Sequence, residues 1–135
     1  MNEHPSELRF MRTLTHPPEK VWCVLTQTRH VGRWYPLPVV DLDPVPGGAV
    51  RFDDGQGALR DGVVTAAEQP RRFEFTDADV VLRFDLRPQD HGCVLVVTLR
   101  LTAPYPAPGT CRHWWKRLDT LETLLADEAP VAAGS

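Results

Sequence analysis

The chain has 135 residues, a length typical of one compact domain with a substantial core. Hydrophobic residues make up 42% of it and charged residues 24%, which are ordinary globular values and exclude wholesale disorder. The formal net charge is −3 with both signs mixed along the sequence, so there is no extended basic surface and we expect no nucleic-acid partner.

The sequence also limits where the protein works. No stretch approaches the ~20 apolar residues that a membrane-spanning helix needs, and the polar N-terminus has no apolar signal region. We therefore expect a cytoplasmic protein with no membrane partner. Cys23, Cys93 and Cys111 are widely spaced, so neither disulfides nor a zinc site is expected. One domain over 1–135 is predicted, with its core at about 7–126 and a frayed tail at 127–135.

The N-terminal third predicts one strand and two short helices. Residues 7–14 alternate, with Leu8, Phe10 and Leu14 on one face, which is typical of a half-buried strand. Pro17-Pro18-Glu19 then predicts a helix start, because proline at the first helical position loses no bonded N–H. A second helix is expected over 29–34, ended by the prolines at 36 and 38.

From residue 49 the hydrophobic period changes to two. The alternation predicts strands at 49–53, 59–68, 72–77, 80–87 and 93–102, separated by glycine-containing turns, which indicates an antiparallel meander. Residues 110–127 predict a long amphipathic helix with the stripe Trp114, Leu118, Leu121 and Leu125. A sheet with one apolar face is best covered by that helix, so the expected fold class is α+β.

Several short strings occur in an order that points to a known family. They are His16-Pro17-Pro18-Glu19-Lys20-Val21-Trp22, Gly32-Arg33-Trp34-Tyr35-Pro36, Gly47-Gly48-Ala49-Val50-Arg51-Phe52, Gly62-Val63-Val64-Thr65, Pro70-Arg71-Arg72-Phe73, and Trp114 followed by Leu118-Asp119 and Leu121-Glu122. Together they resemble bacterial homologues of the C-terminal domain of the Hsp-90 ATPase activator, within the START/Bet v 1-like (SRPBCC, polyketide cyclase-like) superfamily. The resemblance covers about residues 7–126.

This resemblance implies a helix-grip fold, in which a curved antiparallel sheet wraps around a long C-terminal helix and two small helices close one end. The superfamily includes lipid and hormone carriers, cyclase-type enzymes and co-chaperone domains, so the fold does not fix the function. The sequence departs from the family at Trp115, where relatives often have histidine, and at Thr76-Asp77, where an aromatic residue often follows.

The expected fold leaves a cavity between the sheet and the last helix, and apolar side chains of both are candidates for its lining. The competing interpretation is that the same side chains are ordinary core. Arg12 is in phase with Leu8 and Phe10, which makes it a polar cavity candidate, although an arginine near a strand end can also reach solvent. The apolar candidates are Trp34, Phe52, Phe73, Phe75, Leu82, Phe84, Leu86, Val97, Leu99, Trp114, Leu118 and Leu121.

No catalytic constellation is evident in the sequence. It has no G-x-S-x-G, H-E-x-x-H or glycine-rich phosphate motif. Cys111 and His113 would point to different sides of a helix, and all five histidines are predicted at the surface. We therefore predict no catalytic residue, no metal site and no cofactor.

Three functions remain open at this stage. The first is binding of a small hydrophobic or aromatic ligand in the cavity. The second is a protein-interaction module related to the co-chaperone domains, with a protein partner or a homodimer. The third is a cyclase- or hydrolase-type enzyme that acts by positioning its substrate.

Overall fold

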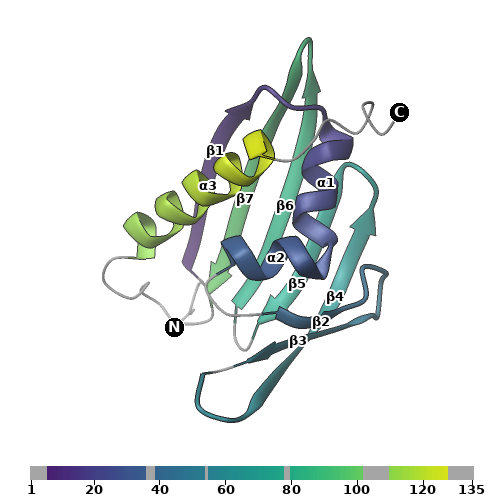
Figure 1. Cartoon of the computed structure of the whole chain (residues 1–135), viewed down its shortest axis with the longest axis vertical. Coiled ribbons are helices and arrows are strands. Elements are labelled where there is room, and N and C mark those ends of the chain that lie inside the picture. The colour runs from purple at the N-terminus through teal and green to yellow at the C-terminus, as the bar shows by residue number, and fades with distance from the viewer. Residues whose placement is uncertain (1–5, 36–38, 54, 78–79, 102–109, 128–135) are drawn as a thin grey trace, which may run out of the picture.

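The computed structural model describes residues 6–35, 39–53, 55–77, 80–101 and 110–127. Within them, one strand and two short helices are followed by six strands and a long last helix (Figure 1). Their order is β1 (Ser6–Leu14), α1 (Pro18–Thr26), α2 (Thr28–Trp34), β2 (Val39–Leu42), β3 (Ala49–Asp53), β4 (Leu59–Glu68), β5 (Arg72–Asp77), β6 (Val80–Gln89), β7 (Gly92–Leu101) and α3 (Thr110–Asp127).

The strands form one antiparallel sheet in the order β1-β7-β6-β5-β4-β3-β2. β1 lies at one edge and pairs with β7 along its whole length, from Ser6 opposite Leu101 to Leu14 opposite Cys93. The predicted meander is therefore confirmed. β2 at the other edge is a strand that the alternation did not predict, because Val39-Val40-Asp41-Leu42 does not alternate and its pairing with β3 shifts register.

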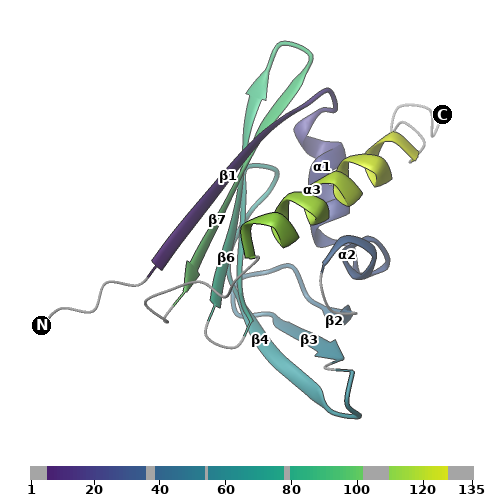
Figure 2. The ribbon, with the colours of Figure 1, turned by 90° about the vertical axis from the view of Figure 1, so that its left-hand side faces the viewer.

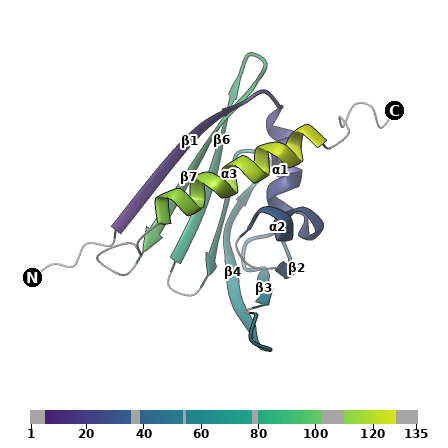
Figure 3. The ribbon, with the colours of Figure 1, turned by 60° about the vertical axis from the view of Figure 1, so that its left-hand side comes forward.

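All three helices lie against the same face of the sheet (Figures 1 and 2). α3 runs obliquely across that face, with α1 and α2 beside it (Figure 3). Its predicted apolar stripe of Trp114, Leu118, Leu121 and Leu125 is buried, and Leu124 is buried with it. The α+β class and the helix-grip arrangement are thus confirmed.

Local sequence signals determine where α1 begins and ends, and one hydrogen bond attaches α2 to it. Pro18 occupies the first position of α1 and Glu19 lies in its first turn, as the sequence predicts. Gln27 ends α1 and precedes α2, so the chain turns sharply between them. The indole Nε1 of Trp34 donates to the carbonyl oxygen of Val24 over 2.9 Å, which ties α2 to α1 and satisfies a buried donor.

The sheet bends within β4. The first half of β4 pairs with β3, its second half pairs with β5, and the register shifts between Val64 and Ala66. At the bend, a Cβ on Gly62 would lie 1.9 Å from the carbonyl oxygen of Thr76, so only glycine allows the two strands to approach this closely. β3 and the first half of β4 consequently curve toward the helices (Figure 2).

Two further expectations concern histidine and membrane helices. The prediction that every histidine lies at the surface is wrong for His30, which is 3% exposed. His30 lies four residues before Trp34 in α2, so the helix turns both side chains to the same inward face. His4 lies outside the described residues. In the described part of the chain, no helix is long and apolar enough to cross a membrane.

Candidate functional site

A cluster of aromatic rings lies between the curved sheet and the helices. We call it the Tyr35 cluster. The ring of Tyr35 stacks on Phe52 at a centroid distance of 5.3 Å and packs against Phe75 at 5.7 Å. It also meets the indoles of Trp34 at 5.8 Å and Trp114 at 6.2 Å. Phe84 completes the cluster through contacts with Trp34 and Phe75.

The cluster contains a buried polar pair. The hydroxyl of Tyr35 donates to Asp77 Oδ2 over 2.5 Å, and both residues are buried. Arg60 Nε lies 2.8 Å from Asp77 Oδ1, which makes an ion pair at the edge of the cluster. Asp77 Oδ1 is nevertheless buried without accepting a hydrogen bond from any described residue. This oxygen therefore keeps capacity to accept a hydrogen bond in addition to its ion pair with Arg60.

Strand alternation and a helix end bring these three residues together. Phe73, Phe75 and Asp77 follow one another at every second position of β5, so the carboxylate lies on the same inner face as the two phenyl rings. Arg60 pairs with Phe52 across β3 and β4. Tyr35 follows the last residue of α2, and its amide donates to the carbonyl oxygen of Val31 over 2.8 Å, which fixes the start of its side chain.

The environment keeps Tyr35 neutral. Burial raises the pKa of the Tyr35 phenol well above its ordinary value, and the negative charge of Asp77 and the hydrogen bond to it raise it further. The positive charge of Arg60 opposes this only in part. The phenol is thus a permanent hydrogen-bond donor to Asp77 at physiological pH, and the pair presents acceptor oxygens to the rings around it.

The apolar residues predicted to line a cavity all belong to one buried core. Those on the strands come from β3, β5, β6 and β7, and Trp114, Leu118 and Leu121 reach them from α3. The structure therefore brings the candidates together. Their rings contact one another, so a ligand in this place would take over contacts that the side chains now make among themselves.

Arg12 lies between β1 and α3. It is on the inner side of β1, as its phase with Phe10 predicts, but its guanidinium turns to α3. Arg12 Nη1 lies 2.7 Å from Asp119 Oδ1 and 3.2 Å from Glu122 Oε1. Its guanidinium carbon lies 5.1 Å from the ring centroid of Trp115. In this structure Arg12 joins a strand to a helix.

Tyr35, Asp77 and Arg60 were not among the residues nominated from the sequence. A signal for Asp77 was present, because it continues the alternation of Phe73 and Phe75. Two other carboxylates of β4 lie away from the cluster: Asp61 pairs with Arg51, and Glu68 with Arg71, each at 3.6 Å on the exposed surface. No group of three metal-binding side chains occurs among the residues that the structure describes.

Fold and site together define a helix-grip α+β protein whose interior holds an aromatic cluster with one buried polar pair, Tyr35 and Asp77. The sequence profile of the activator of Hsp90 ATPase homolog 1-like proteins matches residues 15–126, so the chain belongs to this family. The resemblance read from the sequence strings is thereby confirmed. A search of curated proteins found no match.

Solved structures with the same fold are numerous. A protein from Mesorhizobium loti has a TM-score of 0.78 at 24% identity, covering 92% of this chain and 99% of that one. A protein from Rhodobacter sphaeroides has a TM-score of 0.76 at 22% identity, covering 92% and 95%. A protein in the dynemicin biosynthetic locus has a TM-score of 0.73 at 19% identity, covering 96% of this chain and 49% of that one. At these identities the likeness establishes the START/Bet v 1-like fold.

Proposed function

We propose that this protein binds a small aromatic ligand between the sheet and α3, and that a hydroxyl or amino group of the ligand donates to Asp77 Oδ1. The observation that carries the proposal is the buried carboxylate oxygen in the Tyr35 cluster, which accepts no hydrogen bond from a described residue. Arg60 Nε already lies 2.8 Å from this oxygen, and a donor on a bound ligand would add a hydrogen bond to a charged acceptor, which contributes about 1.5–3 kcal/mol.

The rings packed against Tyr35 suit the rest of such a ligand. Phe52 comes from β3, Phe75 from β5 and Trp114 from α3, so three separately anchored elements supply the walls. A small displacement of α3 would separate Trp114 from Tyr35 without breaking a strand. Edge-to-face and stacked contacts with an aromatic ligand would replace the contacts between rings that are lost, at a similar free energy.

Two probes that differ by one hydroxyl group test the proposal. Binding of 2-naphthol and of naphthalene is measured by titration calorimetry or by chemical-shift changes. A hydrogen bond to a charged acceptor contributes about 1.5–3 kcal/mol, so 2-naphthol should bind at least ~10-fold more tightly than naphthalene.

The variants are chosen so that neither member of the buried Tyr35–Asp77 pair is left without the other; Arg60, which also loses Asp77, is partly exposed to solvent. Asp77→Leu combined with Tyr35→Phe replaces both partners by apolar groups of similar shape and should abolish the preference for 2-naphthol. Asp61→Leu, on the exposed side of β4, is the matched control and should keep it. If neither probe binds, or if the double variant keeps the full preference, the ligand role is rejected and the protein-interaction role takes precedence.

A further inference from the structure

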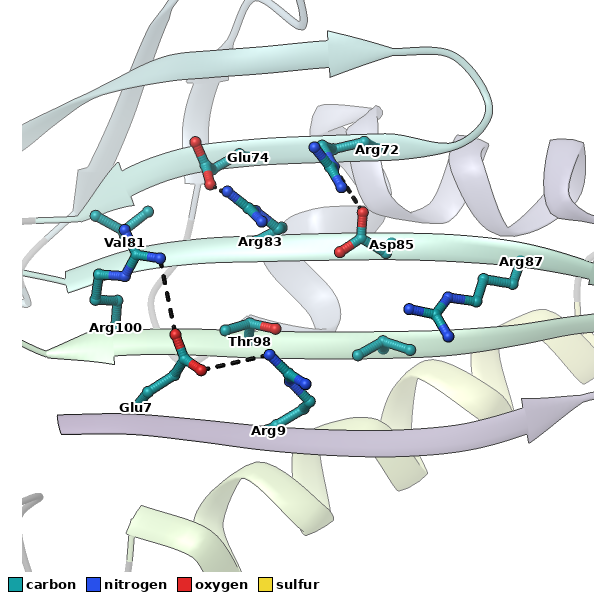
Figure 4. Close-up of a pocket in the computed structure, with 11 residues that line it drawn as sticks. Glu7, Arg9, Arg72, Glu74, Val81, Arg83, Asp85, Arg87, Thr98 and Arg100 are labelled. Atoms are coloured by element: carbon teal, nitrogen blue, oxygen red, sulfur yellow. Dashed lines mark hydrogen bonds and ion pairs between the residues drawn. The ribbon is translucent and has the colours of Figure 1, made fainter.

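The face of the sheet opposite the helices carries a shallow hollow of about 200 Å³ with arginines around it (Figure 4). The arginines come from four neighbouring strands, and the chain as a whole has a net charge of −3. Only three carboxylates, those of Glu7, Glu74 and Asp85, line the same hollow. The hollow is thus a local excess of positive charge on a negative protein. Its arginines are Arg9, Arg72, Arg83, Arg87 and Arg100.

The strand register explains why a hollow forms there. Thr98 on β7 lies opposite Arg9 on β1 and opposite Arg83 on β6. Two residues away on the same two strands, Glu7 of β1 lies opposite Arg100 of β7. The short side chains of β7 therefore form a floor between longer side chains on both neighbouring strands, as Figure 4 shows for Thr98 between Arg9 and Arg83.

The carboxylates around the hollow pair unevenly with its arginines. Arg72 and Arg83 each hold one carboxylate closely, since Arg72 Nε lies 2.7 Å from Asp85 Oδ1 and Arg83 Nε lies 2.8 Å from Glu74 Oε2. Glu7 is shared more loosely, at 3.4 Å from Arg9 and 3.7 Å from Arg100.

Arg87 stands apart from these pairs. The described residues give its guanidinium no carboxylate partner. Each guanidinium carries five N–H donors, so Arg9, Arg87 and Arg100 keep most of theirs available to a ligand.

The floor adds a polar group that the fold does not use. Thr98 is 8% exposed, and its hydroxyl makes no hydrogen bond to another residue in the described ranges. Here it lies beneath guanidinium groups, where it can donate to an anion that they attract.

We propose that this hollow, the outer arginine site, binds a compact oxyanion that carries two or more negative charges on phosphate or carboxylate groups. Guanidinium forks match the paired oxygens of both groups, and Thr98 would donate from below. The site lies on the opposite face of the sheet from the Tyr35 cluster, so the two sites are independent.

Inorganic pyrophosphate is the probe, and its binding to the full chain is measured by titration calorimetry at low ionic strength. Millimolar or tighter binding is expected. Arg87→Gln should weaken it about 10-fold, because one charge-assisted pair is lost. Thr98→Val, which keeps the shape of the side chain, should weaken it several-fold. Arg33→Gln, an equal charge change at an exposed position of α2, should leave it within twofold.

Three results would overturn the proposal. The first is no binding of pyrophosphate to the wild type at millimolar concentration. The second is an equal effect of Arg87→Gln and Arg33→Gln, which would indicate non-specific attraction. The third is a much tighter, Arg87-dependent binding of hexaglutamate, which would assign the face to an acidic polypeptide. Pyrophosphate should still bind the variant with Asp77→Leu and Tyr35→Phe. The test of the outer arginine site therefore does not depend on whether the Tyr35 cluster binds a ligand.

Discussion

Arg12 Nη1 lies 2.7 Å from Asp119 Oδ1, and this contact joins the first strand of the fold to its last helix. The same nitrogen lies 3.2 Å from Glu122 Oε1, one helical turn further along α3. Only 17% of the Arg12 side chain is exposed, whereas 71% of the Asp119 side chain is. The contact therefore adds a partly shielded ion-pair group to the apolar stripe that holds α3 on the sheet.

Arg12→Ala should lower the free energy of unfolding by about 1–2 kcal/mol, because it removes two ion pairs and a cation–π contact with Trp115 at a partly shielded place. Urea denaturation followed by tryptophan fluorescence measures the change. Arg9→Ala is the matched control, since Arg9 lies on the same strand but on the outer face and pairs with Glu7 at 3.4 Å. Equal stability of the two variants would contradict a role for Arg12 in holding α3.

The buried phenol of Tyr35 predicts a loss of stability at alkaline pH. Its pKa in the folded protein is raised above the ordinary value of 10.0, because burial and Asp77 both disfavour the phenolate. The contribution of neutral Tyr35 to the free energy of unfolding is fully present below pH 10.0. It is lost as the pH rises further, because the unfolded chain then releases the phenol proton that the folded chain retains. The slope for one such group is about 1.4 kcal/mol per pH unit.

Unfolding of the wild type and of Tyr35→Phe across alkaline pH tests this prediction. The free energy of unfolding of the wild type should fall as the pH rises above 10.0, the ordinary pKa of tyrosine. The free energy of unfolding of the variant should fall less over the same pH interval. Absorbance at the phenolate band gives a second readout, since Tyr35 should ionise only on unfolding. Identical pH profiles for the two proteins would show that Tyr35 is not shielded as described.

Cys93 should be chemically inert in the folded protein. Burial, and to a lesser extent the negative charge of Glu19, raises the pKa of the Cys93 thiol to about 11 from 9.0. The thiolate fraction at mildly alkaline pH then falls about 100-fold, and alkylation slows with it. Peptide mapping after iodoacetamide treatment measures the labelling. Labelling as fast in the native protein as in urea would refute the assignment.

Gly62 should not tolerate a side chain. A Cβ there would lie 1.9 Å from the carbonyl oxygen of Thr76, so Gly62→Ala must push β4 away from β5 and should cost at least ~2 kcal/mol. Gly32→Ala is the control, because the nearest atom to its Cβ would be the Val39 nitrogen at 3.5 Å, an ordinary contact. Alanine in α2 should be neutral or stabilising by up to ~1 kcal/mol. Thermal unfolding of both variants decides the matter.

Strand alternation and helix signals predicted most of the fold because they depend on local periodicity. The strands at 49–53, 59–68 and 72–77 and the helix at 110–127 have the bounds that the sequence indicates. The alternation did not predict β2, because its two valines are adjacent and a register shift interrupts its pairing with β3. His30 was misplaced because a polar residue in a short helix is usually exposed, whereas here the packing of α2 turns it inward.

The polar pair of the candidate site could be predicted only in part. Asp77 continues the alternation of Phe73 and Phe75, so its inward direction follows from the sequence. Its partner Tyr35 lies 42 positions away in the chain, and only the packing of α2 against the bent sheet brings the hydroxyl to the carboxylate. The outer arginine site likewise depends on the register of four strands, which no single strand encodes.

The most direct test of the ligand role is to locate a bound probe. Intermolecular nuclear Overhauser effects between 2-naphthol and the protein are measured with the wild-type chain. We predict contacts from the naphthol ring to the ring protons of Phe52, Phe75 and Trp114, which pack against Tyr35, the hydrogen-bond partner of Asp77. Contacts only to residues of the outer face, such as Val81 and Val96, would contradict binding between the sheet and α3.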